Sequence, residues 1–301
     1  MRLIKTDSVT IEEFFPSDVP DYAILSHRWG KEEVSLQEFE TVTSAIKAKE
    51  GYKKIASFCH RAKADGYEHV WVDTCCIDKT SSAELSESIN SMYLWYYRAS
   101  RCYAYLSDIA AKSNIHLSEW FMRGWTLQEL IAPEEVYFVN KDWTDLGTKS
   151  TLQQVISIHT GIPQDILTGV AEIESASVAQ RMSWAAKRKT TRLEDTAYCL
   201  MGLFGINMPL LYGEGEQAFL RLQQEIMRVS NDQSILAWTS SDTRGGVLAT
   251  SPAAFTGRED IIRLRHSRNR RNPFTLSSLG VQVEIPFIGV TAHGIGLILL
   301  D

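Results

Sequence analysis

Strand-like and helix-like segments alternate through the first half of this sequence, and this alternation constrains the fold more than any other feature. Apolar, β-rich runs cover 22–30, 69–77, 101–107 and 135–139, with helical spacing of apolar residues at about 52–65 and 82–96. Strands that alternate with helices form βαβ units, in which helices cover both faces of a parallel sheet. The sequence therefore predicts an α/β fold with a parallel sheet.

A helix predicted over 121–130 carries a tryptophan and a glutamate on one face. On a 3.6-residue period, Leu127 and Leu130 lie on one side of this helix. Trp125 and Glu129 lie on the other side. An ordinary surface helix would not place its bulkiest apolar residue beside a charge on its outward face. This face therefore either meets a second layer or lines a cleft.

The second half of the sequence changes from helical to β-rich patterns at about Ser234. The predicted helices cover 177–189, the segment from a Thr191/Glu194 capping box to Gly205, and 214–229, and the predicted strands cover 234–238, 274–287 and 294–301. We expect a larger domain over 1–232, with an α/β core at about 20–145 and a helical extension. A small β-rich domain over 233–301 follows it, and because the sequence stops within an apolar strand, we expect it to continue in a longer protein.

The composition argues against several classes of protein. With a net charge of −6 in 301 residues, the chain has no basic field for nucleic acid or anionic lipid. No apolar run approaches the roughly 20 residues of a membrane span. Five cysteines, an odd number, do not form a disulfide framework, which indicates a reducing cytoplasm. We expect no metal site, because Cys75 and Cys76 would point to opposite sides of a strand and no C-x-x-C or H-x-x-x-H motif occurs.

Polar and aromatic residues gather where the predicted strands end. In open parallel α/β sheets, ligands bind outside the carboxyl ends of the strands. If the strands are neighbours, side chains from the first strand, the second strand and the tryptophan–glutamate helix converge there. These residues are Ser26, His27, Arg28 and Trp29; Asp73, Cys76 and Asp78; and Arg123, Trp125 and Glu129. A stacking aromatic, a cationic anchor and a carboxylate together suit a nucleotide-like ligand.

Each of these residues also has an ordinary structural interpretation. Trp29 and Trp125 are then core aromatics, and His27 is a partly buried structural histidine. Asp73 caps a turn at the strand end, and Glu129 pairs with a nearby cation. The residue pattern alone leaves both interpretations open.

Four blocks of sequence, in this order, resemble the fungal heterokaryon-incompatibility (HET) domain. They are YAILSHRWG at 22–30, VWVDTCCIDK at 70–79, AELSESINSMYLWYYRA at 83–99 and RGWTLQELIAP at 123–133. The segment 192–226 is similar to the continuation found where a HET domain precedes a nucleotide-binding and repeat region. The β-rich tail resembles the small domain that follows it. Two departures are minor: Lys79 stands where glutamine is common, and His27 stands where tyrosine and histidine alternate.

This resemblance implies a cytoplasmic cell-death effector of fungal incompatibility and innate immunity. Such a protein acts when an incompatibility partner or a C-terminal sensor brings copies together by self-association. HET domains are regarded as distant relatives of TIR domains, whose flavodoxin-like fold agrees with the predicted alternation. Many TIR domains cleave NAD with a glutamate in a W-C-x-x-E-L-like helix motif. Trp125, Glu129 and Leu130 match that motif, with Thr126 in place of the cysteine.

The resemblance leaves three functions open. In the first, NAD is a substrate, no cofactor is needed, and Glu129 stabilises the positive charge that develops as the nicotinamide–ribose bond breaks. Trp29 or Trp125 would stack on a ring of the ligand, and Arg28 or Arg123 would meet the diphosphate. In the second, the domain is a non-enzymatic module that signals by assembly. In the third, it binds or transfers a nucleotide derivative.

Overall fold

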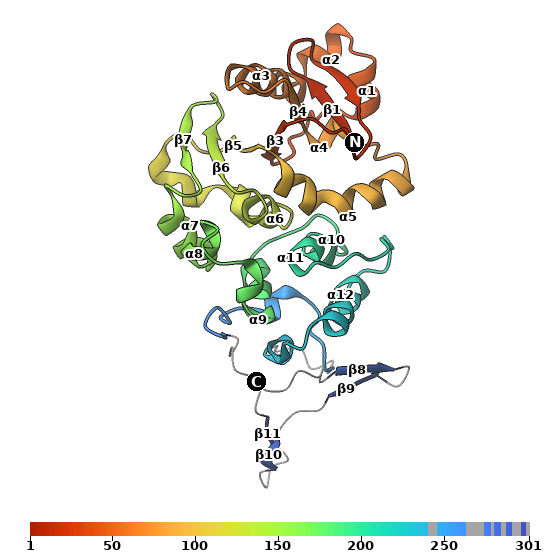
Figure 1. Cartoon of the computed structure of the whole chain (residues 1–301), viewed down its shortest axis with the longest axis vertical. Coiled ribbons are helices and arrows are strands. Elements are labelled where there is room, and N and C mark those ends of the chain that lie inside the picture. The colour runs from red at the N-terminus through yellow and green to blue at the C-terminus, as the bar shows by residue number, and fades with distance from the viewer. Residues whose placement is uncertain (240–245, 263–273, 278–279, 284–286, 291–295, 299–301) are drawn as a thin grey trace. The chain divides into compact units, whose positions relative to one another are not determined.

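The chain forms two compact units, residues 1–170 and 171–301, in a computed structural model (Figure 1). The structure describes residues 1–239, 246–262, 274–277, 280–283, 287–290 and 296–298. No helix within these described segments is long and apolar enough to cross a membrane. All residues of the predicted site lie in the first unit.

The first unit is built on a seven-stranded mixed sheet in the order β2-β1-β4-β3-β5-β6-β7. Its strands are β1 Arg2–Lys5, β2 Thr10–Glu13, β3 Tyr22–His27, β4 His69–Trp71, β5 Arg101–Leu106, β6 Val136–Asn140 and β7 Asp145–Thr148. The four central strands, β4, β3, β5 and β6, are parallel. The edge strands β1, β2 and β7 are antiparallel additions that the sequence does not predict. The predicted α/β fold is confirmed.

The strand order determines where a ligand would bind. The first parallel strand, β3, lies between the second and the third, as in the flavodoxin-like fold. The connections from β3 to β4 and from β4 to β5 run in opposite directions along the sheet. Right-handed crossovers therefore put α3 (Glu50–Ala64) and α5 (Ser82–Arg98) on opposite faces, and α6 (Thr126–Ile131) packs beside α5 (Figure 1). Proteins with this strand order bind ligands where the order reverses, and in this sheet the order reverses at the carboxyl ends of β3 and β5.

Shorter helices connect these elements in the first unit. They are α1 Leu36–Glu40, α2 Ser44–Ala48, α4 Asp73–Cys76, α7 Gln153–Thr160 and α8 Gln164–Leu167, with 3-10 helices η1 Lys112–Leu117 and η2 Glu119–Met122. The N-cap serine of α5, Ser81, accepts a hydrogen bond from the Glu84 amide. The Glu84 side chain does not complete a capping box with Ser81, because it accepts from the Asp78 amide at 2.8 Å instead.

The predicted strand over 69–77 is wrong beyond Trp71. Residues 73–76 form α4, in which the Cys76 amide donates to the Val72 carbonyl at 2.9 Å. Cys75 and Cys76 are therefore both buried in one helical turn and do not point to opposite sides of a strand. A short apolar run suits a buried strand and a buried helical turn equally, so periodicity could not separate them.

The tryptophan–glutamate helix begins later than predicted, at Thr126. Residues 119–122 form η2, and the backbone at Arg123 is extended. The Thr126 hydroxyl donates to the Arg123 carbonyl at 3.0 Å, which holds the extended residue against the start of the helix. Arg123 therefore precedes α6 and does not lie in its first turn.

The second unit is helical up to Val229. Its elements are η3 Ile173–Ser175, α9 Val178–Ala185, α10 Asp195–Tyr198, α11 Met201–Phe204, α12 Gln217–Val229, η4 Gln233–Leu236, η5 Pro252–Phe255, β8 Phe274–Ser277, β9 Gly280–Val283, β10 Phe287–Val290 and β11 Gly296–Ile298. Strand β8 pairs with β9, and β10 pairs with β11, so the predicted small β-rich part is confirmed over the described residues. The boundary between 232 and 233, and continuation of the chain in a longer protein, stay predictions.

Two local predictions in the second unit are wrong. Residues 234–236, predicted as a strand, lie in η4, where the Asp232 carboxylate caps the Ser234 amide at 2.9 Å. The capping box from Thr191 to Glu194 does not form. The Glu194 carboxylate instead accepts from the amides of Gly213 at 2.8 Å and Gly215 at 3.1 Å.

Candidate functional site

The last two residues of β3 divide the predicted site into two polar clusters. Successive side chains of a strand point to opposite faces of a sheet. Ser26 meets Glu129 of α6, and His27 lies on the other face, toward α3. We call the first group the Glu129 cluster and the second the His27 cluster. The Glu129 cluster is Ser26, Trp120 and Glu129, and the His27 cluster is His27, Glu33, Lys54 and Asp73.

A directed chain of hydrogen bonds holds the Glu129 carboxylate. The Trp120 indole donates from Nε1 to the Ser26 Oγ at 2.8 Å, and the Ser26 hydroxyl donates to Glu129 Oε2. Because an indole N–H only donates, the Ser26 oxygen accepts from it, and the serine proton is directed to the carboxylate. The Cys102 thiol lies 3.9 Å from the Glu129 backbone carbonyl, on β5 beside β3. The Glu129 carboxylate is thus fixed beside Ser26, at the carboxyl end of β3.

Burial raises the pKa of Glu129 to about 7, against a hydrogen bond from Ser26 that lowers it. The negative charge of Asp73 raises this pKa further, and the positive charge of Arg123 lowers it. The residue is 9% exposed. The acid and the carboxylate are therefore both populated near neutral pH, which is a property of groups that exchange protons during a reaction.

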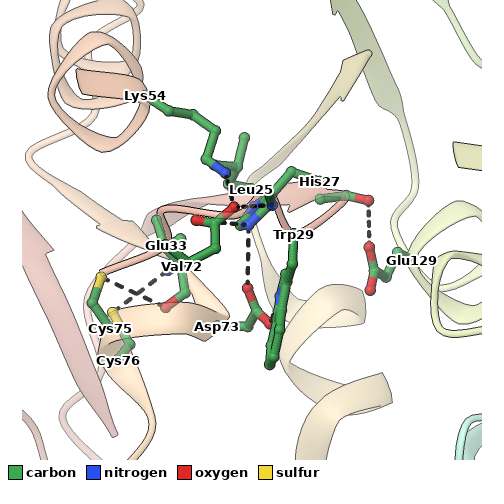
Figure 2. A network of polar contacts seen from close by, with 12 residues as sticks. Leu25, His27, Trp29, Glu33, Lys54, Val72, Asp73, Cys75, Cys76 and Glu129 are labelled. Atoms are coloured by element: carbon green, nitrogen blue, oxygen red, sulfur yellow. Dashed lines mark hydrogen bonds and ion pairs between the residues drawn. The ribbon is translucent and has the colours of Figure 1, made fainter. Parts of the chain in front are cut away.

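The His27 cluster contains buried polar atoms that make no hydrogen bond within the described residues; the dashed lines from His27 in Figure 2 mark longer contacts with Glu33 and Asp73. Lys54 Nζ lies 2.6 Å from one oxygen of Glu33. His27 Nε2 lies 3.8 Å from the other oxygen of Glu33 and 3.8 Å from Asp73 Oδ1, which is too long for a hydrogen bond. Within the described part of the chain, neither ring nitrogen of His27 has a hydrogen-bond partner, and Glu33 Oε2 has none either.

Burial lowers the pKa of His27 well below its usual range, and the positive charges of Lys54, Lys79 and Arg123 add to this effect. The imidazole is therefore neutral at physiological pH, and its contacts with the two carboxylates are not ion pairs. Burying a neutral polar ring without partners costs stability. A buried polar ring without hydrogen-bond partners, at the carboxyl end of a parallel sheet, is typical of a functional site.

Trp29 lies between the two clusters and exposes 45% of its surface. Its indole N–H donates to Asp73 Oδ2 at 2.7 Å (Figure 2). The Lys79 ammonium lies over the ring, 3.7 Å from its centroid, and the Arg123 guanidinium carbon lies 6.0 Å from it. Trp29 is therefore a solvent-accessible aromatic surface with a fixed ring and two cations near it.

Six of the predicted site residues come together at this edge of the sheet. They are Ser26, His27, Trp29, Asp73, Arg123 and Glu129. Trp125 is half-buried at the N-cap of α6, one turn from Glu129. No contact that would make it a stacking surface is described, so its role stays a prediction.

Three other predicted residues have local structural partners. Arg28 forms an ion pair with Glu119. Cys76 is buried in α4, with its sulfur 3.5 Å from the Val72 amide. Asp78 accepts hydrogen bonds from Thr80 and from the Gln37 amide group. Whether Arg28, Cys76 and Asp78 bind a ligand stays a prediction.

The sequence does not single out four residues that complete the site. Glu33 comes from the loop after β3, Lys54 from α3, and Trp120 from η2, and Lys79 enters only as a departure from a motif. None has a local signal, because each reaches the site through the crossing of distant elements. Among the described residues, no group of three or more His, Cys, Asp or Glu side chains could hold a metal ion.

Comparison with known proteins finds two family profiles that match parts of this chain. The profile of the family "Heterokaryon incompatibility protein (HET)" matches residues 22–117, which include Ser26, His27, Trp29 and Asp73 but end before Glu129. A second profile, "Domain of unknown function (DUF8212)", matches residues 217–282. No solved structure matches the chain significantly.

A curated relative extends the similarity beyond these residues. The chain is 42% identical over 242 residues to the vegetative incompatibility protein HET-E-1 of Podospora anserina. The alignment covers 75% of this chain and 18% of that protein, so the chain spans less than a fifth of its relative. The chain belongs to the heterokaryon incompatibility (HET) family, whose domain it carries at residues 22–117.

Proposed function

We propose that this chain is the HET-domain part of a fungal incompatibility protein that promotes cell death, and that its Glu129 site hydrolyses the N-glycosidic bond of NAD or a related nucleotide. The name of the Podospora anserina relative, a vegetative incompatibility protein, supports the biological role. The proposal includes a cytoplasmic location and activation by self-association. An incompatibility partner or a C-terminal sensor would bring the copies together.

The position of Glu129 is the observation that carries the enzymatic part of the proposal. The carboxylate lies where the order of the parallel strands reverses, the place at which folds with this strand order bind ligands. Its pKa, raised by burial to about 7, is typical of a residue with a chemical role. The flavodoxin-like strand order also supports the proposed kinship with NAD-cleaving TIR domains.

The chemistry needs an anion beside the ribose. As the bond between ribose and nicotinamide breaks, its electron pair leaves with the nicotinamide and positive charge develops on the sugar. Ionised Glu129, held by the chain from Trp120 through Ser26, would stabilise that charge without reorganising. Water then adds to the sugar carbon and loses one proton, which leaves ADP-ribose and free nicotinamide. Trp29 offers an exposed ring for stacking, and Arg123 offers a cation for the diphosphate.

Replacement of Glu129 by glutamine tests the proposal, because it keeps the size of the side chain and removes its charge. We expect Glu129→Gln to slow nicotinamide release from NAD by roughly 10²–10⁴-fold, the usual contribution of a positioned catalytic group. The assay uses concentrated protein, so that assembly is not limiting. The control is Glu87→Gln, at an exposed glutamate of α5, which should behave as the wild type. Equal nicotinamide release by Glu129→Gln and wild type would falsify the assignment.

Two observations favour a second candidate, a non-enzymatic module that signals by assembly. Glu129 is 9% exposed and already accepts a hydrogen bond from Ser26, which also suits a structural carboxylate. Trp29 and Met122 are exposed by 45% and 37%, and exposed large apolar side chains anchor interfaces. Under this alternative, Trp29→Ala weakens self-association and cell death, whereas Glu129→Gln leaves both intact.

A further inference from the structure

The ring of Trp29 is covered by a cation of the protein itself. Lys79 Nζ lies 3.7 Å from the ring centroid, well inside the range of cation–π contacts. The same ammonium lies 4.0 Å from Asp73 Oδ2, which is the oxygen that accepts from the Trp29 indole at 2.7 Å. The three side chains thus form one unit at the edge of the site: a fixed ring, an anion in its plane and a cation over its face.

This unit favours positive charge over the ring. The hydrogen bond from the indole to a carboxylate polarises the ring and makes its face more negative. Asp73 adds negative charge at the same edge, whereas the charge of the nearby Glu33 is balanced by Lys54 at 2.6 Å. A neutral or anionic group over the ring would gain nothing from these charges.

Within the described residues, the Lys79 ammonium makes a cation–π contact and an ion pair but no hydrogen bond. Burial lowers the pKa of Lys79, against the charge of Asp73 that raises it, so loss of hydration is the larger effect on the ammonium. Its separation from Asp73, 4.0 Å, is an ion-pair distance without a hydrogen bond. A ligand cation that brings further contacts elsewhere in the site can therefore take its place.

We propose that the face of Trp29 recognises a cationic ring of the ligand, and that Lys79 is a built-in competitor that occupies this face until the ligand displaces it. The inference rests on the proposed function for the identity of the ligand. In NAD, the nicotinamide ring carries a positive charge, and in reduced NADH the same ring is neutral. The site therefore distinguishes the oxidised from the reduced nucleotide by charge.

Binding measurements with matched probes test this inference without relying on turnover. The probes are 1-methylnicotinamide, a cation, and nicotinamide, its neutral counterpart, followed by NAD and NADH. Isothermal titration calorimetry in the Glu129→Gln background avoids hydrolysis. We expect the cationic probe of each pair to bind more tightly, and we expect Trp29→Leu to abolish the difference.

Substitution of Lys79 gives the sharper result. Lys79→Gln removes the competing cation and should increase the affinity for 1-methylnicotinamide and NAD by roughly 3–30-fold, the range of a cation–π contact converted to a binding ratio. Lys79→Arg keeps a cation over the ring and should resemble the wild type. The control Lys31→Gln removes a positive charge from an exposed lysine in the loop after β3 and should change neither affinity.

The outcomes separate this inference from the proposed function. The inference is wrong if Lys79→Gln binds 1-methylnicotinamide and NAD no more tightly than the wild type does. It is also wrong if the wild type binds the cationic and the neutral probe of a pair with equal affinity. Either result counts against the inference even where NAD is hydrolysed. If the charge preference and the effect of Lys79→Gln are found but wild-type protein releases no nicotinamide, the inference stands and the hydrolytic proposal fails.

Discussion

Opposite ends of one sheet carry polar clusters of similar composition, but the two clusters differ in how completely their groups are paired. At the amino ends of the parallel strands, Asp65 accepts hydrogen bonds from the Tyr103 hydroxyl and from Arg61 Nε at 2.9 Å. Arg101 lies 3.1 Å from the same carboxylate and stacks over Tyr137 at 4.2 Å. This amino-edge cluster has the complete pairing that is usual for a structural network.

At the carboxyl ends, the pairing is incomplete. His27 lies between two carboxylates without a hydrogen bond to either, and Glu129 has a pKa raised by burial. We therefore expect the charges at the amino edge to stabilise the fold, and those at the carboxyl edge to contribute little to its stability or to reduce it. Proteins keep such costly groups where they serve a function.

The largest expected effect is on the pH dependence of stability through Glu129. The pKa of Glu129 is about 7 in the folded state, above the ordinary value of 4.5. Between pH 4.5 and pH 7 the folded protein therefore binds one proton more than the unfolded chain does. The stabilisation of the folded state by this proton is complete below pH 4.5 and is lost as the pH rises through 7. It amounts to about 3 kcal/mol. Urea unfolding from pH 5 to 8 should show this loss in wild type and Glu87→Gln but not in Glu129→Gln. Parallel curves for all three proteins would contradict it.

Asp65 should show the opposite dependence on pH. Burial raises its pKa, but the hydrogen bonds from Tyr103 and Arg61 outweigh burial, and the pKa is lowered overall. Its stabilisation is therefore present above the pKa of an unfolded aspartate and is lost in acid. We expect Asp65→Asn to lower the free energy of unfolding by about 2 kcal/mol at pH 7.

The matched substitution in the other cluster is Asp73→Asn, which should cost less than about 1 kcal/mol. Asp73 accepts one hydrogen bond, from the half-exposed indole of Trp29, and its other oxygen faces the His27 ring, which makes no hydrogen bond within the described residues. Urea unfolding at pH 7 compares the two variants. Equal costs for Asp65→Asn and Asp73→Asn would remove the distinction between the two edges.

Ser26 should control the protonation of Glu129. Its hydroxyl is directed to the carboxylate and stabilises the ionised form. Ser26→Ala should therefore raise the pKa of Glu129 by about 1 unit, as expected for one hydrogen bond to a charged group. The carbon-13 chemical shift of the Glu129 carboxyl reports this change. Ser113→Ala, at an exposed serine, is the control, and an unchanged titration in Ser26→Ala would show that the hydroxyl does not act on Glu129.

The smallest expected effect has opposite signs at the two edges. His27→Leu replaces an unpaired buried ring by an apolar side chain and should stabilise the protein by up to about 1 kcal/mol. Tyr103→Phe removes a paired hydroxyl from the amino-edge cluster and should destabilise it by about 1 kcal/mol. Thermal unfolding measures both variants. Destabilisation by His27→Leu would mean that the imidazole has a structural partner.

The sequence predicts the core of this fold because the core follows local patterns. Strands β3, β5 and β6 come from apolar runs, and the helices between them come from 3.6-residue spacing. The edge strands escape prediction because four-residue antiparallel strands carry little periodic signal. Residues 73–76 escape it because a buried turn and a buried strand have the same composition.

The site is predictable only in part for a related reason. Ser26 at the end of β3, Asp73 just after β4 and Glu129 on a helix after β5 come together through the general rule for parallel sheets. Glu33 and Lys54 join through the path of a loop and the crossing of α3, which no local pattern encodes. The alternation of side chains along β3 was available from the sequence, but the partners on each face were not.

Alternation along β3 also links the register of the sheet to the chemistry at its edge. A slip of this strand by one residue relative to β5 would exchange the faces of Ser26 and His27. The His27 imidazole would then lie beside the Trp120 indole and the Glu129 carboxylate. The Ser26 hydroxyl would lie on the other face, beside Lys54. A misaligned sheet therefore could not retain either polar cluster, so an insertion or deletion within β3 should break the hydrogen bond from Ser26 to Glu129 even where the protein still collapses to a compact form.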